Sequence, residues 1–153
     1  MKKICLILTC FILILTLCAC KSEDTAAFEK SDEYAKPFLE SLVAKNNEDM
    51  AKYIHPDYMA EAMPTDKFYS DMAEKHFFKP NKTLTAVTAT GKSYINNTDI
   101  EGTLLECAYV IFYNELYYDV KITVLDNEKG YGVISFGMEL NLDTDLYLPE
   151  DGE

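Results

Sequence analysis

The chain contains no arginine and no tryptophan, and all 14 of its basic residues are lysines. Against these stand 26 acidic residues, which give a formal net charge of −12 at pH 7. Nucleic-acid binding needs a basic surface that neutralises phosphates, so this balance argues against a nucleic-acid partner. The composition, 48% hydrophobic and 26% charged, is that of a globular protein, and 153 residues suffice for one ordinary domain and a leader.

The first 19 residues have the layout of an export signal. A positive start, Lys2 and Lys3, precedes a nearly unbroken apolar run from Leu6 to Leu17. The run is too short for a comfortable membrane-spanning helix, and its place at the N-terminus is typical of a signal peptide. We therefore predict a signal peptide over residues 1–19.

The residues around the end of this segment, Leu17-Cys18-Ala19-Cys20, resemble a bacterial lipobox. In that pattern an aliphatic residue stands three positions before an invariant cysteine, and a small residue stands one position before it. The resemblance implies that the leader is cut before Cys20 and that Cys20 receives a diacylglyceryl thioether, which anchors the chain to the extracytoplasmic face of a cell membrane. Two acyl chains give stable anchoring where one is only marginal. An uncleaved N-terminal anchor and a signal cut at an ordinary small-residue site are the alternatives.

Such processing changes the charge and the cysteine count. The leader contains two lysines and no acid, so 12 bases remain against 26 acids and the formal charge becomes −14. Three of the five cysteines leave with it and Cys20 is alkylated, so Cys107 is the one free thiol and no internal disulfide forms. Cys107 lies in an apolar run, which predicts a buried, unreactive side chain.

The first half of the exported part predicts helices. Apolar residues recur at helical spacing over residues 34–43, with Ser31 or Asp32 as the N-cap. Pro37 interrupts this stripe, so the helix either starts near Lys36 or kinks at the proline. Asn47 is expected to cap a second helix over residues 48–54. Thr65 is expected to cap a third over residues 66–77, whose stripe is formed by Phe68, Met72 and His76.

From residue 82 on, the hydrophobic period changes from 3.6 to 2, which predicts strands. The alternation is strictest over residues 116–125, and tight turns are expected at Asn114-Glu115 and at residues 126–130. The predicted strands cover residues 83–90, 104–113, 116–125 and 131–140. In the last of them, the residues expected on one face are Ile134, Phe136, Met138 and Leu140.

Helices followed by an antiparallel meander predict an α+β domain, with two or three N-terminal helices packed on one face of a four-stranded antiparallel sheet. We place this domain at residues 31–141. It follows a polar tether at residues 20–30, which begins with the lipidated cysteine, and it precedes an acidic tail at residues 142–153.

This order of elements resembles the NTF2-like and cystatin-like superfamily over residues 31–140. The segment FLESLVAKNNEDMAKYIHPDYM is similar to the opening of such domains, where a first helix ends in a polar turn and a short helix follows. The resemblance implies a bent sheet that wraps a helix and leaves a conical cavity. The small hairpin that many members carry after the second helix has little room between His55 and Thr65.

No pattern in the sequence predicts a metal ion, a cofactor or a catalytic centre. The two histidines, His55 and His76, are separated by 20 residues and no HExxH motif occurs, so we expect His55 to cap a helix end and His76 to lie on a helix face. The sequence also lacks GxSxG, SxxK and a glycine-rich phosphate loop.

Tyrosine is the remaining candidate for ligand binding, with 11 residues in the chain. A tyrosine offers a wide apolar ring and one hydroxyl, which suits the mouth of a ligand cavity and equally suits plain packing against a sheet. The alternation along the strands places Tyr109, Tyr113 and Tyr118 on the inner face. His55 and Tyr58, at the end of the helical region, are expected near the mouth of the same cavity. The candidate ligand-binding residues are therefore His55, Tyr58, Tyr109, Tyr113 and Tyr118.

These features favour a membrane-anchored, non-enzymatic binding or accessory module outside the cytoplasm. Besides the membrane, its partner would be a small ligand, a peptide or another envelope protein. One alternative is an acidic immunity or sequestering lipoprotein that attracts a cationic peptide. Another, by analogy with NTF2-like folds alone, is an isomerase or dehydratase that uses an inward acid or histidine with a tyrosine donor.

Overall fold

The structure is a computed structural model that describes residues 23–78 and 84–142. The predicted signal peptide, Cys20 and the predicted tail after Leu142 lie outside the described residues. The chain divides into two units after Lys30, and the sheet belongs to the unit that begins at Ser31. Among the described helices, none is long and apolar enough to cross a membrane.

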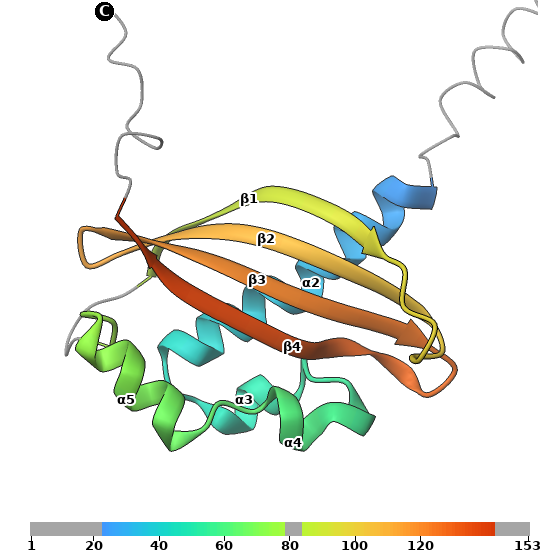
Figure 1. Cartoon of the computed structure of the whole chain (residues 1–153), viewed down its shortest axis with the longest axis horizontal. Coiled ribbons are helices and arrows are strands. Elements are labelled where there is room, and N and C mark those ends of the chain that lie inside the picture. Colours follow the sequence, from blue (N-terminus) through green and yellow to red (C-terminus); the bar gives the residue numbers. More distant parts are fainter. Residues whose placement is uncertain (1–22, 79–83, 143–153) are drawn as a thin grey trace, which may run out of the picture. The chain divides into compact units, whose positions relative to one another are not determined.

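Helices precede strands, as predicted (Figure 1). The described helices are α2 (Glu23–Val43), α3 (Asn47–Ala51), a 3₁₀ turn (Pro56–Tyr58), α4 (Met59–Ala62) and α5 (Asp66–Glu74). The strands are β1 (Leu84–Ile95), β2 (Thr103–Tyr113), β3 (Leu116–Asn127) and β4 (Gly130–Asn141).

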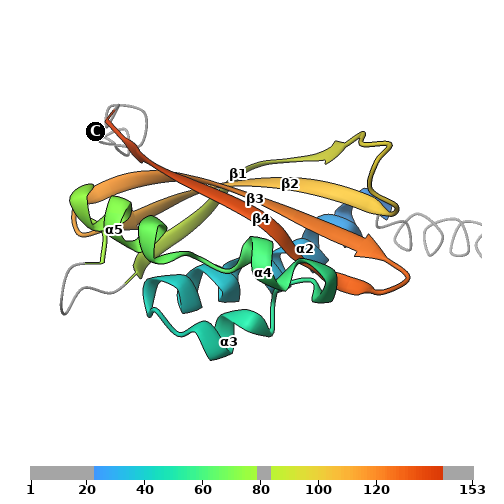
Figure 2. The same ribbon diagram turned by 60° about the horizontal axis from the view of Figure 1, so that its bottom comes forward.

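The four strands form one antiparallel sheet in the order β1-β2-β3-β4. The tight connection between β2 and β3 is confirmed, because Asn114 and Glu115 both have positive φ angles, 52° and 64°, as a type I′ hairpin turn requires. The helices lie on one face of the sheet (Figure 2). The predicted α+β class, with helices packed on a four-stranded antiparallel sheet, is therefore confirmed.

Helix α2 differs from the prediction at its start. It spans Glu23–Val43, so residues 23–30 of the expected tether are helical, which fits their alanines. Ser31 and Asp32 are not N-caps but lie inside the helix, which also continues through Pro37. A proline within a helix costs about 3 kcal/mol. Burial of the apolar residues that follow it offsets this cost, because Phe38, Leu39 and Leu42 are fully buried.

The second helix is shorter than predicted. Helix α3 ends at Ala51, and its N-cap is Asn46 rather than Asn47, because the Asn46 side chain accepts a hydrogen bond from the Asp49 N–H at 3.1 Å. The 3₁₀ turn and α4, which follow it, were not predicted. Short helices of this kind carry too few residues for a recognisable apolar period.

The third helix begins where predicted and ends early. Thr65 caps α5, since its hydroxyl accepts a hydrogen bond from the Phe68 N–H at 3.2 Å. The helix ends at Glu74, so the prediction that His76 lies on a helix face is wrong. His76 is exposed and has a φ of 67°, which lies in the left-handed region.

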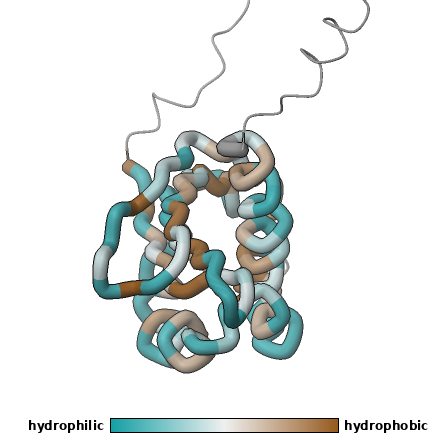
Figure 3. Tube along the Cα trace, turned by 90° about the vertical axis from the view of Figure 1, so that its right-hand side faces the viewer, coloured by the Kyte–Doolittle hydropathy of each residue, from teal (hydrophilic) through white to brown (hydrophobic). Residues whose placement is uncertain are grey.

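The core lies between the sheet and the helices. Along β3, the buried residues Tyr118, Val120, Ile122 and Val124 alternate with exposed or half-buried ones, as predicted. Figure 3 shows hydrophobic (brown) and hydrophilic (teal) stretches along the chain trace. The predicted inward position of Tyr109, Tyr113 and Tyr118 is confirmed, because each is at most 1% exposed. Cys107 is also buried, as expected.

A β-bulge in β4 changes which face Ile134 occupies. The register shifts opposite Thr123 and Val124, so Ile134 is the extra residue between two paired positions. The prediction that Ile134 shares a face with Phe136 is therefore wrong. Ile134 packs instead with Leu104 and Leu125 in a small second core, which is partly covered by Tyr58, Ile95 and Ile100.

Candidate functional site

The five predicted ligand-binding residues lie in three separate places. His55 and Tyr58 contact each other edge to face, with ring centroids 5.7 Å apart. Tyr113 and Tyr118 both pack on Phe77, at centroid distances of 4.4 and 4.7 Å. The hydroxyl of Tyr109 instead donates to a carboxylate on α2. The structure thus confirms the inward direction of the tyrosines but does not bring all five residues to one cavity mouth.

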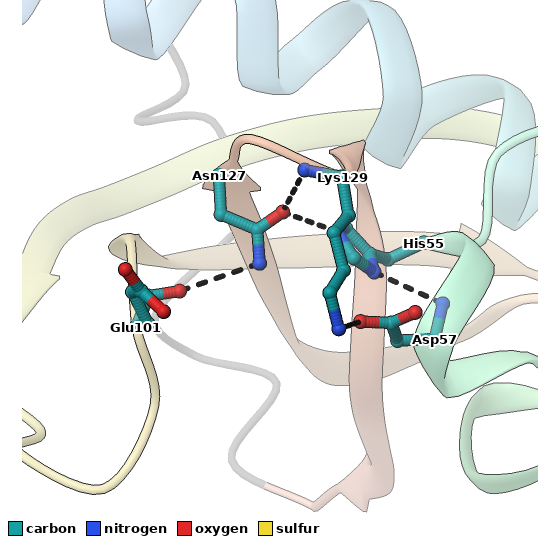
Figure 4. Close-up of polar contacts among 5 residues, drawn as sticks. All are labelled: His55, Asp57, Glu101, Asn127 and Lys129. Carbon is teal, nitrogen blue, oxygen red and sulfur yellow. Dashed lines mark hydrogen bonds and ion pairs between the residues drawn. The ribbon is translucent and has the colours of Figure 1, made fainter.

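His55 is fully buried and both of its ring nitrogens are engaged (Figure 4). Nδ1 accepts a hydrogen bond from the Asp57 N–H at 3.2 Å, and Nε2 lies 3.1 Å from Asn127 Oδ1. Because Nδ1 is an acceptor, the network assigns the proton to Nε2, which donates to Asn127. His55 is the N-cap of the 3₁₀ turn, so its predicted role as a helix cap is confirmed.

The contacts around His55 join three segments that are distant in sequence. Asn127 Oδ1 also accepts from the Lys129 N–H at 2.9 Å, and its Nδ2 donates to the Glu101 carbonyl at 3.3 Å (Figure 4). Lys129 Nζ forms an ion pair with Asp57 at 2.7 Å, and this hydrogen bond raises the pKa of Lys129. The network therefore fastens the β3–β4 turn to the 3₁₀ turn and to the loop before β2.

Backbone contacts reinforce this attachment. The His55 N–H donates to the Val133 carbonyl, and the Val133 N–H donates to the Tyr53 carbonyl, both at 2.9 Å. Ile54 thereby forms a parallel bridge with Val133 at the edge of β4. With both nitrogens engaged and no exposure, His55 is a structural residue here. Among the described residues, no group of three or more histidine, cysteine, aspartate or glutamate side chains could hold a metal ion.

A second polar cluster lies between α2 and the inner face of the sheet. Asp32 Oδ1 accepts hydrogen bonds from the Tyr109 hydroxyl at 2.7 Å and from Lys92 Nζ at 2.6 Å. Its Oδ2 lies 3.2 Å from Lys36 Nζ. Burial alone would raise the pKa of Asp32, but the hydrogen bonds from Lys92, Tyr109 and Lys36 outweigh it and lower the pKa. Burial and the bond to Asp32 raise the pKa of Tyr109.

Sequence reasoning missed Lys92 because the first strand was predicted to end at residue 90, whereas β1 continues to Ile95 and contains a bulge. The register of β1 shifts between Ala89 and Gly91, which places Lys92 opposite Cys107 on the inner face. Cys107 Sγ itself donates to the buried Ser31 hydroxyl at 3.3 Å. This cluster is a link between helix and sheet, and its side chains are engaged with one another.

The lowered pKa of Asp32 predicts a contribution to stability that depends on pH. A carboxyl whose pKa is lower in the folded state stabilises the fold above its unfolded value, near 3.8, and this contribution is lost as the pH falls through the folded pKa. We expect Asp32→Asn to destabilise the chain at neutral pH. The difference in free energy of unfolding from wild type should shrink between about pH 5 and about pH 2.

Urea unfolding of the two chains at several pH values measures this difference. Glu33→Gln, an exposed neighbour on the same helix, is the control. Its free energy of unfolding should fall at acid pH in the same way as that of wild type. A difference between wild type and Asp32→Asn that stayed constant with pH would contradict the assignment.

An open groove of about 440 Å³ lies between α5 and the last two strands. Figure 1 shows α5 beside the C-terminal half of β4, which is the edge strand of the sheet. The groove is lined from α5 by Phe68, Asp71, Met72 and Lys75, from β3 by Asp119 and Lys121, and from β4 by Phe136, Gly137, Met138 and Glu139.

The groove has an apolar floor. The rings of Phe68 and Phe136 meet edge to face with centroids 5.0 Å apart. Met72 and Met138, 2% and 6% exposed, lie beside them. Methionine side chains are flexible and polarisable, so such a floor can adapt to apolar groups of different shape. None of the five predicted ligand-binding residues lines this groove.

The rim of the groove is charged. Asp119 and Glu139 are directly opposite each other on β3 and β4, and Asp119 accepts a hydrogen bond from the Asn141 side chain at 2.9 Å. Asp71 is paired with Lys67. The sequence showed the apolar periods that supply the floor, but not that α5 would lie beside β4, which is a tertiary arrangement.

Protein-family models, curated proteins and solved structures were compared with the chain, and none of them matches it.

Proposed function

We propose that the chain is a lipid-anchored, extracytoplasmic binding module that acts without catalysis. The observation that carries this proposal is the order of a positive start, an apolar run and the lipobox-like Leu17-Cys18-Ala19-Cys20. Such an anchor holds a protein at a membrane surface, where a compact domain meets soluble or envelope partners.

The groove between α5 and β4 supports the binding part of this proposal. It combines an apolar floor with a charged rim, which is the usual composition of a site that buries apolar groups and orients polar ones. The histidine and tyrosine side chains that an NTF2-like enzyme would use are instead buried in structural contacts, His55 with Asn127 and Tyr109 with Asp32. These contacts favour binding over the isomerase or dehydratase alternative.

We also propose that the domain is of the NTF2-like or cystatin-like kind. Helix α2 from Ser31 on and a four-stranded antiparallel sheet support this proposal. Where the resemblance implies a conical cavity, Tyr109, Tyr113 and Tyr118 occupy the inner face with at most 1% exposure. The groove that we propose for binding therefore lies at the edge of the sheet and not in its interior.

Metabolic labelling of bacteria that express the full chain tests the proposed location. We expect the chain to incorporate a palmitate analogue and to react, in intact cells of a host with one membrane or in spheroplasts, with an amine reagent that cannot cross membranes. Its lysines, which are its sole basic residues, supply the amines. An acylated chain that stayed protected from the reagent would contradict an extracytoplasmic location, and an unlabelled chain would contradict the lipid anchor.

A further inference from the structure

We infer that the groove between α5 and β4 binds an extended peptide segment in which basic residues alternate with apolar ones, added as a fifth strand along the free edge of β4. This inference rests on the proposed binding function and names the chemistry of the partner. Three features of the groove carry it: an open strand edge, two faces of different chemistry along that edge, and a pair of like charges.

Within the part of the chain that the structure describes, the edge of β4 is open beside the groove. The parallel bridge from Ile54 covers the edge at Val133. From Ile134 to Asn141, no other strand of the described residues pairs with the outer side of β4. An uncovered edge presents backbone N–H and C=O groups that a further strand can satisfy, which is the basis of peptide recognition by strand addition.

The two faces of β4 differ in chemistry along this edge. Phe136 and Met138 point to the inner face, where Phe136 meets Phe68 on α5, whereas Gly137 and Glu139 belong to the outer face. A peptide strand laid beside β4 has the same alternation, with successive side chains on opposite faces. Its inward residues would enter the apolar floor, and its outward residues would lie beside Glu139.

The charge of the outer face selects a basic partner. Asp119 and Glu139 are cross-strand neighbours of like sign, an arrangement that costs free energy in a sheet. Among the described residues, no cation is paired with Glu139. Of the three carboxylates on the rim, Asp71 is paired with Lys67, so Asp119 and Glu139 carry the like charges that a partner would meet, and the rim also contains Lys75 and Lys121. The whole chain has a net charge of −12. A lysine or arginine placed outward relieves the repulsion between the two carboxylates.

The same charges argue against a second copy of this chain as the occupant. Two chains of −12 each repel one another, and pairing β4 with β4 would bring two Asp119 and Glu139 pairs to one interface. Like charges that face each other at an interface disfavour association. A cationic peptide meets neither obstacle.

Gly137 provides a variant that blocks the groove without disturbing the fold. A Cβ atom at Gly137 meets no atom within 4 Å, although the residue lines the groove. Gly91, on β1, is also in a strand with nothing within 4 Å of a Cβ, and it does not line the groove. Gly137→Tyr and Gly91→Tyr are thus a matched pair that differ in whether the new ring enters the groove.

The test uses the full lipidated chain in phosphatidylcholine nanodiscs and a fluorescent, end-blocked heptapeptide in which four lysines alternate with valine, phenylalanine and valine. Fluorescence anisotropy measures its affinity. We expect Gly137→Tyr to weaken binding at least about tenfold and Gly91→Tyr to leave it within about twofold.

The double variant Asp119→Asn with Glu139→Gln should weaken peptide binding about fivefold and reduce the dependence of binding on salt. Glu106→Gln, on the same sheet face outside the groove, should change neither.

Two changes to the peptide test the mode of binding. Glutamate in place of lysine should abolish binding, and proline in place of both valines should weaken it at least about tenfold, because proline has no N–H for a strand. Failure of the lysine peptide to bind, equal losses in the two glycine variants, or an unaffected proline peptide would each overturn the inference.

The intact mass of the same sample reports acylation separately. A chain that carries no lipid but binds the peptide would contradict the lipid anchor alone. An acylated chain that does not bind the peptide would contradict the peptide inference alone.

Discussion

Replacing Gly132 by alanine is expected to destabilise the domain by about 3 kcal/mol, which is the upper part of the range for overpacking a buried site. A Cβ atom at Gly132 would lie 2.4 Å from the His55 nitrogen, 2.7 Å from the Ile54 carbonyl carbon and 2.8 Å from the His55 Cα. All three are backbone atoms, so no side chain can rotate to make room. The substitution must separate the segment around His55 from β4, and with it the two backbone hydrogen bonds to Val133.

Thermal unfolding of the full chain measures this effect. A loss of this size should lower the Tm by about 10 °C for a domain of this length. Gly91→Ala is the control, because its Cβ meets nothing within 4 Å, and it should leave the Tm unchanged or slightly raised. If Gly132→Ala unfolded within 2 °C of wild type, close packing of the His55 segment on β4 could not be a main support of the fold.

The parts of the fold that the sequence predicts are those determined by neighbouring residues. The alternation along β3 places Tyr118, Val120 and Ile122 inward because the side-chain period of a strand is two. Thr65 caps α5 because a hydroxyl before the first turn accepts from an N–H that the helix leaves unpaired. Both features depend only on residues within one element.

The predictions that were wrong concern interactions between elements. Helix α2 continues through Pro37 because the residues after the proline are buried, which outweighs a local preference. The bulge at Ile134 and the bulge before Gly91 depend on how two strands pair, so no single-strand pattern shows them. Each bulge moves the residues beside it to the other face of the sheet, which is how Lys92 came to meet Asp32.

The candidate site also depends on contacts between elements that are distant in sequence. His55 is 72 residues from its partner Asn127, and the groove forms where α5 meets β4. The apolar periods on each element were visible in the sequence as core positions. What the sequence does not encode locally is that, within residues 23–78 and 84–142, no further strand pairs with the edge of β4 beside them.

The second large effect is expected at Cys20. In a lipoprotein the thiol of this cysteine is the site of lipid attachment, and the leader is removed only after that step. Replacing Cys20 by alanine should therefore reduce incorporation of a palmitate analogue to background. The chain should also keep the mass of residues 1–19, which contain two of its 14 lysines, and it should remain tied to the membrane only through the apolar run from Leu6 to Leu17.

Cys18→Ala is the matched control for this experiment. It removes a cysteine two positions away but leaves the aliphatic residue, Leu17, the small residue, Ala19, and Cys20 in place, so labelling and processing should both match wild type. Palmitate labelling of Cys20→Ala equal to wild type would show that the lipobox interpretation is wrong. A label that is retained in Cys20→Ala but lost in Cys18→Ala would instead place the acyl group on Cys18. An unlabelled wild-type chain that is cut nearby would favour an ordinary signal peptide, and the groove at β4 would then belong to a protein that is exported but not anchored.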